Sequence, residues 1–128
     1  ECIFHFPSRE KFFQEAIRVL KPGGKIALSD FSTSNFFTAF LSKFFESYVV
    51  TTYGFVNSIT PADYQKLAQS YGLKPFEIDD ITFNTLPTYP MLQKLPVFSH
   101  KDAIKINRIL EWATRLGLLR YLVLSTTV

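Results

Sequence analysis

The chain reads Arg18-Val-Leu-Lys-Pro-Gly-Gly-Lys-Ile-Ala-Leu-Ser-Asp30 where its first predicted helix gives way to its first predicted strand. Upstream, Ser8 can cap a helix over residues 9–20, because apolar residues recur there at the spacing of one helical face. Pro22 presets φ for a turn, and the glycines after it tolerate positive φ, so the helix ends here. Residues 25–31 form a nearly continuous apolar run, which is typical of a parallel strand covered on both faces.

Outside this stretch, the pattern continues to alternate between helices and strands. The expected helices cover residues 35–50, 62–71 and 102–116, and the expected strands cover residues 73–83 and 120–128. The helix with the clearest start follows a capping box formed by Thr60 and Asp63. Residues 1–6 look like the exit of a strand, and the Pro-rich residues 85–99 predict irregular chain with a short helix near 91–95. The order of elements indicates an α/β fold.

Composition excludes several classes of protein. With 128 residues, of which 47% are hydrophobic and 20% charged, the chain has room for one packed domain and is not disordered. The net charge of +3 is scattered rather than gathered in a basic stripe, so nucleic acid is not an expected partner. No apolar run is long enough to span a membrane, and the residues show no metal-ligand spacing. A single cysteine fits a reducing compartment, so we expect a cytoplasmic protein.

A family resemblance rests on two segments, Glu1-Cys-Ile-Phe-His-Phe-Pro-Ser-Arg-Glu10 and the stretch from Arg18 to Asp30. Together they resemble the second half of a class I, Rossmann-like, S-adenosylmethionine-dependent methyltransferase of the small-molecule, type 11 kind. The family's glycine-rich cofactor motif and its ribose-holding acid have no counterpart here. We therefore interpret the chain as a C-terminal fragment that is inactive alone and does not bind the cofactor appreciably by itself.

The resemblance implies how the single partial domain is divided. Residues 1–31 would contain the exit of the fourth strand, the crossover helix and the fifth strand. Residues 32–59 would form a helical substrate-cap insertion, and residues 60–128 the C-terminal helices with the last two strands. The expected architecture is the C-terminal half of a Rossmann-like methyltransferase sheet, with helices on both faces and the last strand antiparallel.

Candidate site residues follow the fourth strand, because ligands of open α/β sheets bind beyond the carboxyl ends of the strands. The resemblance implies that this segment lines the cofactor and faces the reactive methyl group. Glu1, Cys2 and Ile3 are then the candidates for cofactor contact, and Phe4 is a candidate for acceptor contact. The alternative is that Ile3 and Phe4 simply belong to the core.

His5 is the candidate for chemistry. Methyl transfer to a hydroxyl group requires alignment of the nucleophile and removal of its proton. Histidine changes its protonation near neutral pH, which suits a general base, and related methyltransferases often place a histidine in this segment. The alternative is a structural histidine whose ring nitrogens hold the loop.

Acceptor-binding candidates come from two further places. Ser29 and Asp30 are expected at the carboxyl end of the fifth strand, although a carboxylate at such a position is more often a loop cap. The insertion carries an aromatic band that includes Phe40, Phe44 and Tyr48, and in the family this insertion supplies much of the acceptor pocket. Aromatic walls would favour an apolar or ring-bearing acceptor, although ordinary core packing also explains the band.

The expected function is S-adenosylmethionine-dependent methyl transfer to a small organic acceptor, at oxygen or carbon, by a longer chain. One alternative is another Rossmann-like enzyme such as a dehydrogenase. The second is a non-catalytic partner subunit or remnant that keeps the fold without the cofactor.

Overall fold

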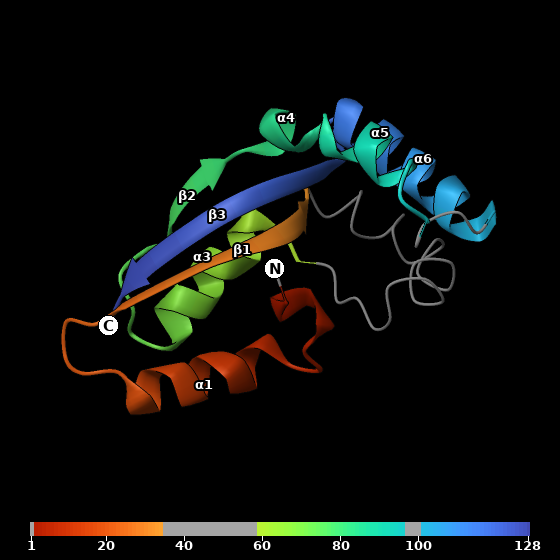
Figure 1. Ribbon diagram of the computed structural model, residues 1–128. Coiled ribbons are helices and arrows are strands. Elements are labelled where there is room, and N and C mark those ends of the chain that lie inside the picture. The colour runs from red at the N-terminus through yellow and green to blue at the C-terminus, as the bar shows by residue number, and fades with distance from the viewer. Residues whose placement is uncertain (1, 35–58, 97–100) are drawn as a thin grey trace.

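The computed structural model describes residues 2–34, 59–96 and 101–128 (Figure 1). In chain order, the described elements are η1 (Ile3–His5), α1 (Arg9–Val19), β1 (Lys25–Thr33), α3 (Pro61–Ser70), β2 (Glu77–Asp80), α4 (Thr82–Thr85), α5 (Thr88–Leu92), α6 (Lys101–Arg115) and β3 (Leu119–Thr127). The alternation confirms the α/β class.

The described strands form one sheet in the order β1-β3-β2. β3 is antiparallel to both neighbours, with Lys25 opposite Thr127 on one side and Glu77 opposite Ser125 on the other. The antiparallel orientation predicted for the last strand is therefore confirmed. The parallel neighbour expected for β1 is not found among the described residues, where its partner is the antiparallel β3.

Helices α1 and α3 lie over the same face of the sheet (Figure 1). The core between them and the strands consists of Ile3, Phe13, Ile26, Ile59, Tyr64, Ala68, Leu73, Phe76, Leu122 and Leu124. Phe13 is completely buried, and its ring makes edge-on contacts with Tyr64 and Phe76 at centroid distances of 6.4 and 5.7 Å. This aromatic centre joins α1 to α3 and to the chain before β2.

Both predicted helix starts are confirmed. The Ser8 hydroxyl accepts a hydrogen bond from the Lys11 backbone N–H at 3.1 Å, at the start of α1. At the start of α3, the Thr60 hydroxyl accepts from the Asp63 N–H, and the Asp63 carboxylate accepts from the Thr60 N–H, both at 3.2 Å. These bonds satisfy backbone donors that a helix start leaves without partners.

The predicted strand over residues 73–83 is wrong in its length, since β2 contains only Glu77–Asp80. The Asp80 carboxylate accepts hydrogen bonds from the backbone N–H and the hydroxyl of Thr82, which turns the chain into the short helix α4. The Thr82 hydroxyl also accepts from the Tyr121 N–H at 3.0 Å, in place of a strand bond. Alternating apolar residues cannot reveal these side-chain bonds.

Two smaller predictions also need correction. The short helix of the Pro-rich segment is α5, at Thr88–Leu92, which starts earlier than predicted. Residues 3–5 form a 3-10 turn, η1, rather than extended strand exit. The helix expected over residues 35–50 lies outside the described residues.

Helices α4, α5 and α6 lie beyond the end of the sheet at which β1 finishes (Figure 1). Tyr89 of α5 and Thr114 of α6 join their hydroxyl groups at 2.9 Å. Of the helices in the described ranges, none has both the length and the apolar character that a membrane crossing requires.

Candidate functional site

The turn η1 brings the candidate residues to the carboxyl end of β1. Backbone bonds from the His5 N–H to the Cys2 carbonyl (3.0 Å) and from the Phe6 N–H to the Ile3 carbonyl (3.1 Å) close the turn. Ile3 and Phe4 point inward and are 3% and 9% exposed. Cys2 and His5 are left exposed on the outer side.

Packing fixes this turn to the strand beside it. Ile3 belongs to the core, while the Phe4 ring lies edge-on to Phe31 of β1 at a centroid distance of 5.4 Å. Phe31 in turn contacts Tyr121 of β3 at 4.8 Å. The side chains of Ile3 and Phe4 are therefore buried, as the alternative prediction had it. If Ile3 contacts the cofactor, the contact has to come from its backbone.

Ser29 and Asp30 do not follow the strand, so the position predicted for them at its carboxyl end is wrong. β1 continues to Thr33, which places both residues inside the strand rather than after it. Successive side chains of a strand point to opposite faces. The Ser29 hydroxyl lies 3.5 Å from the Tyr121 hydroxyl, whereas Asp30 points to the face covered by α1 and α3.

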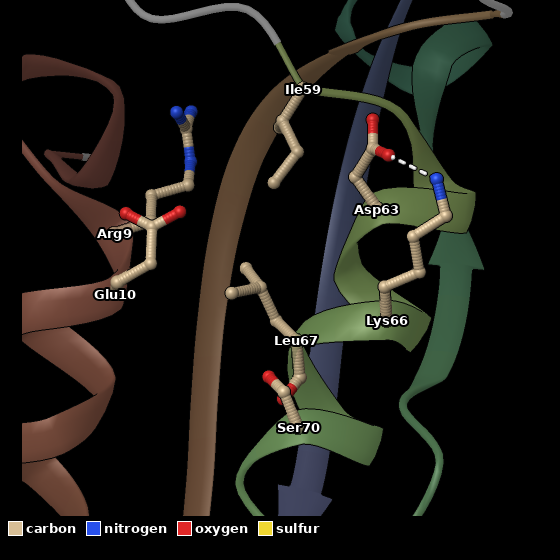
Figure 2. Close-up of a pocket in the computed structure, with 7 residues that line it drawn as sticks. All are labelled: Arg9, Glu10, Ile59, Asp63, Lys66, Leu67 and Ser70. Carbon is tan, nitrogen blue, oxygen red and sulfur yellow. Dashed lines mark hydrogen bonds and ion pairs between the residues drawn. The ribbon is translucent and has the colours of Figure 1, made fainter.

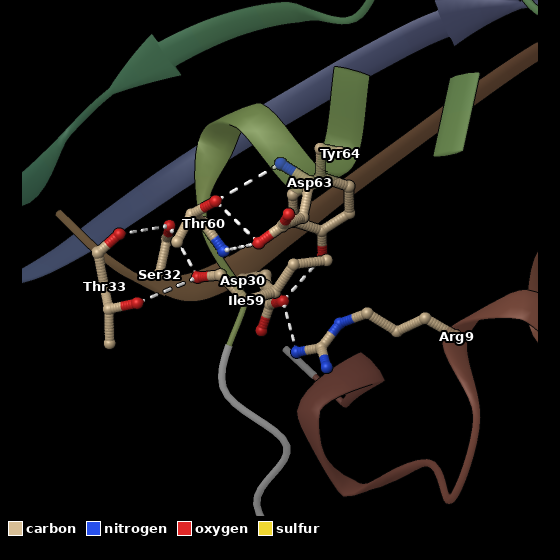
Figure 3. Close-up of polar contacts among 8 residues, drawn as sticks. All are labelled: Arg9, Asp30, Ser32, Thr33, Ile59, Thr60, Asp63 and Tyr64. Carbon is tan, nitrogen blue, oxygen red and sulfur yellow. Dashed lines mark hydrogen bonds and ion pairs between the residues drawn. The ribbon is translucent and has the colours of Figure 1, made fainter. Parts of the chain in front are cut away.

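Asp30 is the centre of a buried polar cluster that it forms with Arg9 and Tyr64 (Figure 3). Its Oδ2 atom accepts hydrogen bonds from Arg9 Nη2 at 2.7 Å and from the Tyr64 hydroxyl at 2.6 Å. Asp30 has no exposed surface, and its Oδ1 atom has no hydrogen-bond partner among the described residues. The cluster joins the first residue of α1, the interior of β1 and the first half of α3.

Burial dominates the electrostatics of this cluster. It raises the pKa of the Asp30 carboxyl, although the Arg9 charge and the hydrogen bond from Tyr64 act in the opposite direction. Burial also raises the pKa of the Tyr64 hydroxyl, and the neighbouring carboxylate adds to this effect. Tyr64 therefore stays protonated and donates its hydrogen bond across the physiological pH range.

Arg9 and Tyr64 were missed in the sequence, although Arg9 gives a weak signal there. A cation is unfavourable at a helix N-terminus, where the helix dipole is positive. Arg9 nevertheless occupies the first position of α1. A basic residue directly after a capping serine is mildly unfavourable for the helix, and in the fold the pair with Asp30 offsets this.

The chain on the two sides of the predicted insertion meets at the end of β1. The Ile59 carbonyl accepts hydrogen bonds from the Thr33 N–H and the Ser32 hydroxyl, both at 3.0 Å, and from the Thr33 hydroxyl at 3.4 Å (Figure 3). The two ends of the predicted insertion are thus joined beside the carboxyl end of β1. Phe40, Phe44, Tyr48 and the rest of the aromatic band lie outside the described residues, as does Glu1.

A groove of about 500 Å³ runs between α1 and α3 (Figure 2). It is lined by Arg9, Glu10, Ile59, Asp63, Lys66, Leu67 and Ser70. None of the predicted site residues that the structure describes lines this groove. Its rim carries an ion pair between Asp63 and Lys66 at 3.0 Å, so we interpret it as a gap between two helices and not as the candidate site. In the same described ranges, no three His, Cys, Asp or Glu side chains are grouped so that they could hold a metal.

The known proteins whose sequences are similar to this chain are methyltransferases. The profile of the family described as "Methyltransferase domain" matches residues 1–28. Methyltransferase GfsG of Streptomyces halstedii is 30% identical over 99 residues, which are 77% of this chain and 34% of that protein. Demethylmenaquinone methyltransferase of Tropheryma whipplei (strain Twist) is 30% identical over 82 residues, or 64% of this chain and 34% of that protein.

The fold is also shared with solved structures. Mycolic acid cyclopropane synthase CmaA1 superimposes with a TM-score of 0.78 at 16% identity, covering 99% of this chain and 53% of that one. The chain spans about a third of the length of the curated relatives it matches. The family match over residues 1–28 and the curated methyltransferases that resemble the chain confirm the resemblance to class I methyltransferases, and the shared fold agrees with it.

Proposed function

We propose that the complete protein transfers a methyl group from S-adenosylmethionine to a small organic acceptor. The named methyltransferases among the relatives support this reaction class. Solved proteins with the same fold are complexes with S-adenosylhomocysteine or S-adenosylmethionine, which supports this cofactor. A cytoplasmic location, predicted from the single cysteine, is part of the same proposal.

The exposed His5 on the η1 turn is the observation that carries the proposal. The turn is closed by its own backbone bonds and packed on β1 through Phe4 and Phe31, at the sheet edge where ligands of α/β folds bind. S-adenosylmethionine, when bound, supplies an electrophilic methyl group on a sulfonium. His5 would take the proton from the acceptor hydroxyl as that oxygen attacks, so we favour O-methylation.

The residues at and directly before η1 would contact only the sulfonium end of the cofactor. Cys2 is exposed and the Ile3 side chain is buried, so the Cys2 side chain and the backbone of residues 1–3 would lie beside the reactive methyl group. The chain has no Gly-x-Gly-x-Gly segment, so in this proposal the ribose and amino-acid portions are held by residues outside it. Glu1 belongs to the same proposed contact set.

The acceptor would lie between the η1 turn and the insertion. Phe40, Phe44 and Tyr48 from the insertion would give its pocket aromatic walls, which favours an apolar or ring-bearing acceptor. Phe4 is 9% exposed and lies against Phe31, so it would support the pocket from behind rather than form its wall. Both chain ends of the insertion are anchored at Thr33 and Ile59, beside β1's carboxyl end, which supports this placement. Asp30 is fully buried, so its contribution to acceptor binding would be indirect.

The experiment is transfer of labelled methyl from S-adenosylmethionine by the complete protein, offered a panel of acceptors. We expect label on ring-bearing or apolar hydroxyl compounds and little label on small polar amines, because aromatic walls exclude strongly hydrated groups. Label on polar amines alone would contradict the proposed acceptor class.

A pair of phenylalanine variants serves as the control for the pocket. Phe44→Ala should raise the KM of the acceptor while the affinity for S-adenosylmethionine stays close to that of the parent enzyme. Phe83→Ala should change neither, because Phe83 is 73% exposed on α4. Equal weakening of both ligands in a folded Phe44→Ala enzyme would assign Phe44 to the core.

A further inference from the structure

We propose that Arg9 is a positioning residue for the turn that carries His5. This inference rests on the proposed function, because it assumes that His5 takes a proton from the acceptor. Arg9 would not touch the acceptor; it would act by holding the first turn of α1 against β1 through Asp30.

The placement of Arg9 requires a specific partner. Its side chain is 3% exposed, and it stands at the N-terminus of α1, where the helix dipole opposes a cation. A buried charge is tolerated when it is paired and hydrogen-bonded. Asp30, with 0% of its side chain exposed, provides this pair at 2.7 Å. Pairing at so unfavourable a position fixes where the first turn of α1 lies.

The link from Arg9 back to His5 is short and stiff. Only Phe6, Pro7 and Ser8 separate them. Phe6 is extended and is bonded to the Ile3 carbonyl, proline fixes its own φ, and Ser8 is held by its cap bond to the Lys11 N–H. A shift of the first turn of α1 is therefore passed on to η1 and is not absorbed by a loose loop.

Tyr64 is the third residue of the cluster that holds the first turn of α1 against β1. Its hydroxyl donates to the same Asp30 oxygen as Arg9, at 2.6 Å, and it lies one turn after the Thr60 cap of α3. Arg9, Asp30 and Tyr64 thus join α1, β1 and α3 (Figure 3). Loss of Arg9 would release the first turn of α1, while Phe13 still holds the rest of the helix and β1 and α3 stay joined, so the displacement would fall on the His5 side.

The test compares two arginines of the same helix in the complete enzyme. Arg9→Met should lower kcat by about 10-fold to 10²-fold, the cost of a displacement of the order of 1 Å at a reacting group. The affinity for S-adenosylmethionine should stay close to that of the parent enzyme. Arg18→Met is the matched control: Arg18 is 67% exposed and pairs with Glu15 near the other end of α1, so kcat should not change. Arg9→Lys should recover most of the activity, because the ion pair uses one nitrogen and one oxygen.

The His5→Ala background separates positioning from general destabilisation. If Arg9 acts through His5, Arg9→Met should have no further effect on kcat once His5 is alanine. An equal loss in both backgrounds, or a normal kcat for Arg9→Met alone, would overturn the positioning role and leave the proposed function standing. A near-normal kcat for His5→Ala would overturn both the positioning role of Arg9 and the catalytic role of His5.

If Arg9→Met fails to fold, Tyr64→Phe replaces it as the test, because it keeps the ring and removes one hydrogen bond to Asp30. A loss of kcat that disappears in the His5→Ala background would support the positioning role of the cluster. A Tyr64→Phe enzyme with no loss of kcat would refute it.

Discussion

Replacing His5 with alanine in the complete enzyme is expected to lower kcat by about 10²–10⁴-fold, the usual contribution of a positioned acid or base. The imidazole is exposed on η1 and would face the acceptor, so the affinity for S-adenosylmethionine should change little.

The measurement is steady-state kinetics, with circular dichroism as the check on folding. Phe83→Ala is the control, since Phe83 is 73% exposed on α4 and is not among the proposed site residues. Its kcat should stay close to that of the parent enzyme. A folded His5→Ala enzyme with near-normal kcat would make His5 a structural residue.

Truncating Phe13 to alanine is expected to lower the free energy of unfolding by about 3–5 kcal/mol, the range for deletion of a buried aromatic ring. Phe13 is 0% exposed and contacts Phe12, Tyr64 and Phe76 edge-on, so its removal opens a cavity at the junction of α1 and α3. Denaturant unfolding of the complete protein gives the measurement.

Val19→Ala is the control for that experiment, because Val19 lies on the same helix and is 66% exposed. Its effect should be within about 0.5 kcal/mol, as for most surface substitutions. If Phe13→Ala costs no more than Val19→Ala, the packing described between α1, α3 and the sheet is wrong.

Local signals in the sequence predicted the parts of the fold that depend on neighbouring residues. The cap at Ser8, the capping box of Thr60 and Asp63 and the extent of α1 were all predicted, because each depends on bonds between residues a few positions apart. The antiparallel last strand was also predicted, but from the family resemblance and not from any pattern in residues 120–128.

Contacts between distant residues explain what the sequence did not reveal. Asp30 was expected at the end of a strand facing the crevice, yet β1 runs on to Thr33, and Asp30 pairs with Arg9, 21 positions away, and Tyr64, 34 positions away. β2 is shorter than its alternating pattern because Thr82 bonds to Asp80 and to Tyr121, 39 positions away. Periodicity carries no information on such pairs.

Titration calorimetry of the complete protein with S-adenosylmethionine tests the central claim most directly. The account predicts saturable binding at one site per chain, retained in His5→Ala, because His5 would act on the acceptor and not hold the cofactor. Residues 1–128 alone should show no comparable binding, since the residues proposed to hold the ribose lie outside them. A complete, folded protein that binds no S-adenosylmethionine would contradict the account and would identify the chain as part of a non-catalytic relative that keeps only the fold.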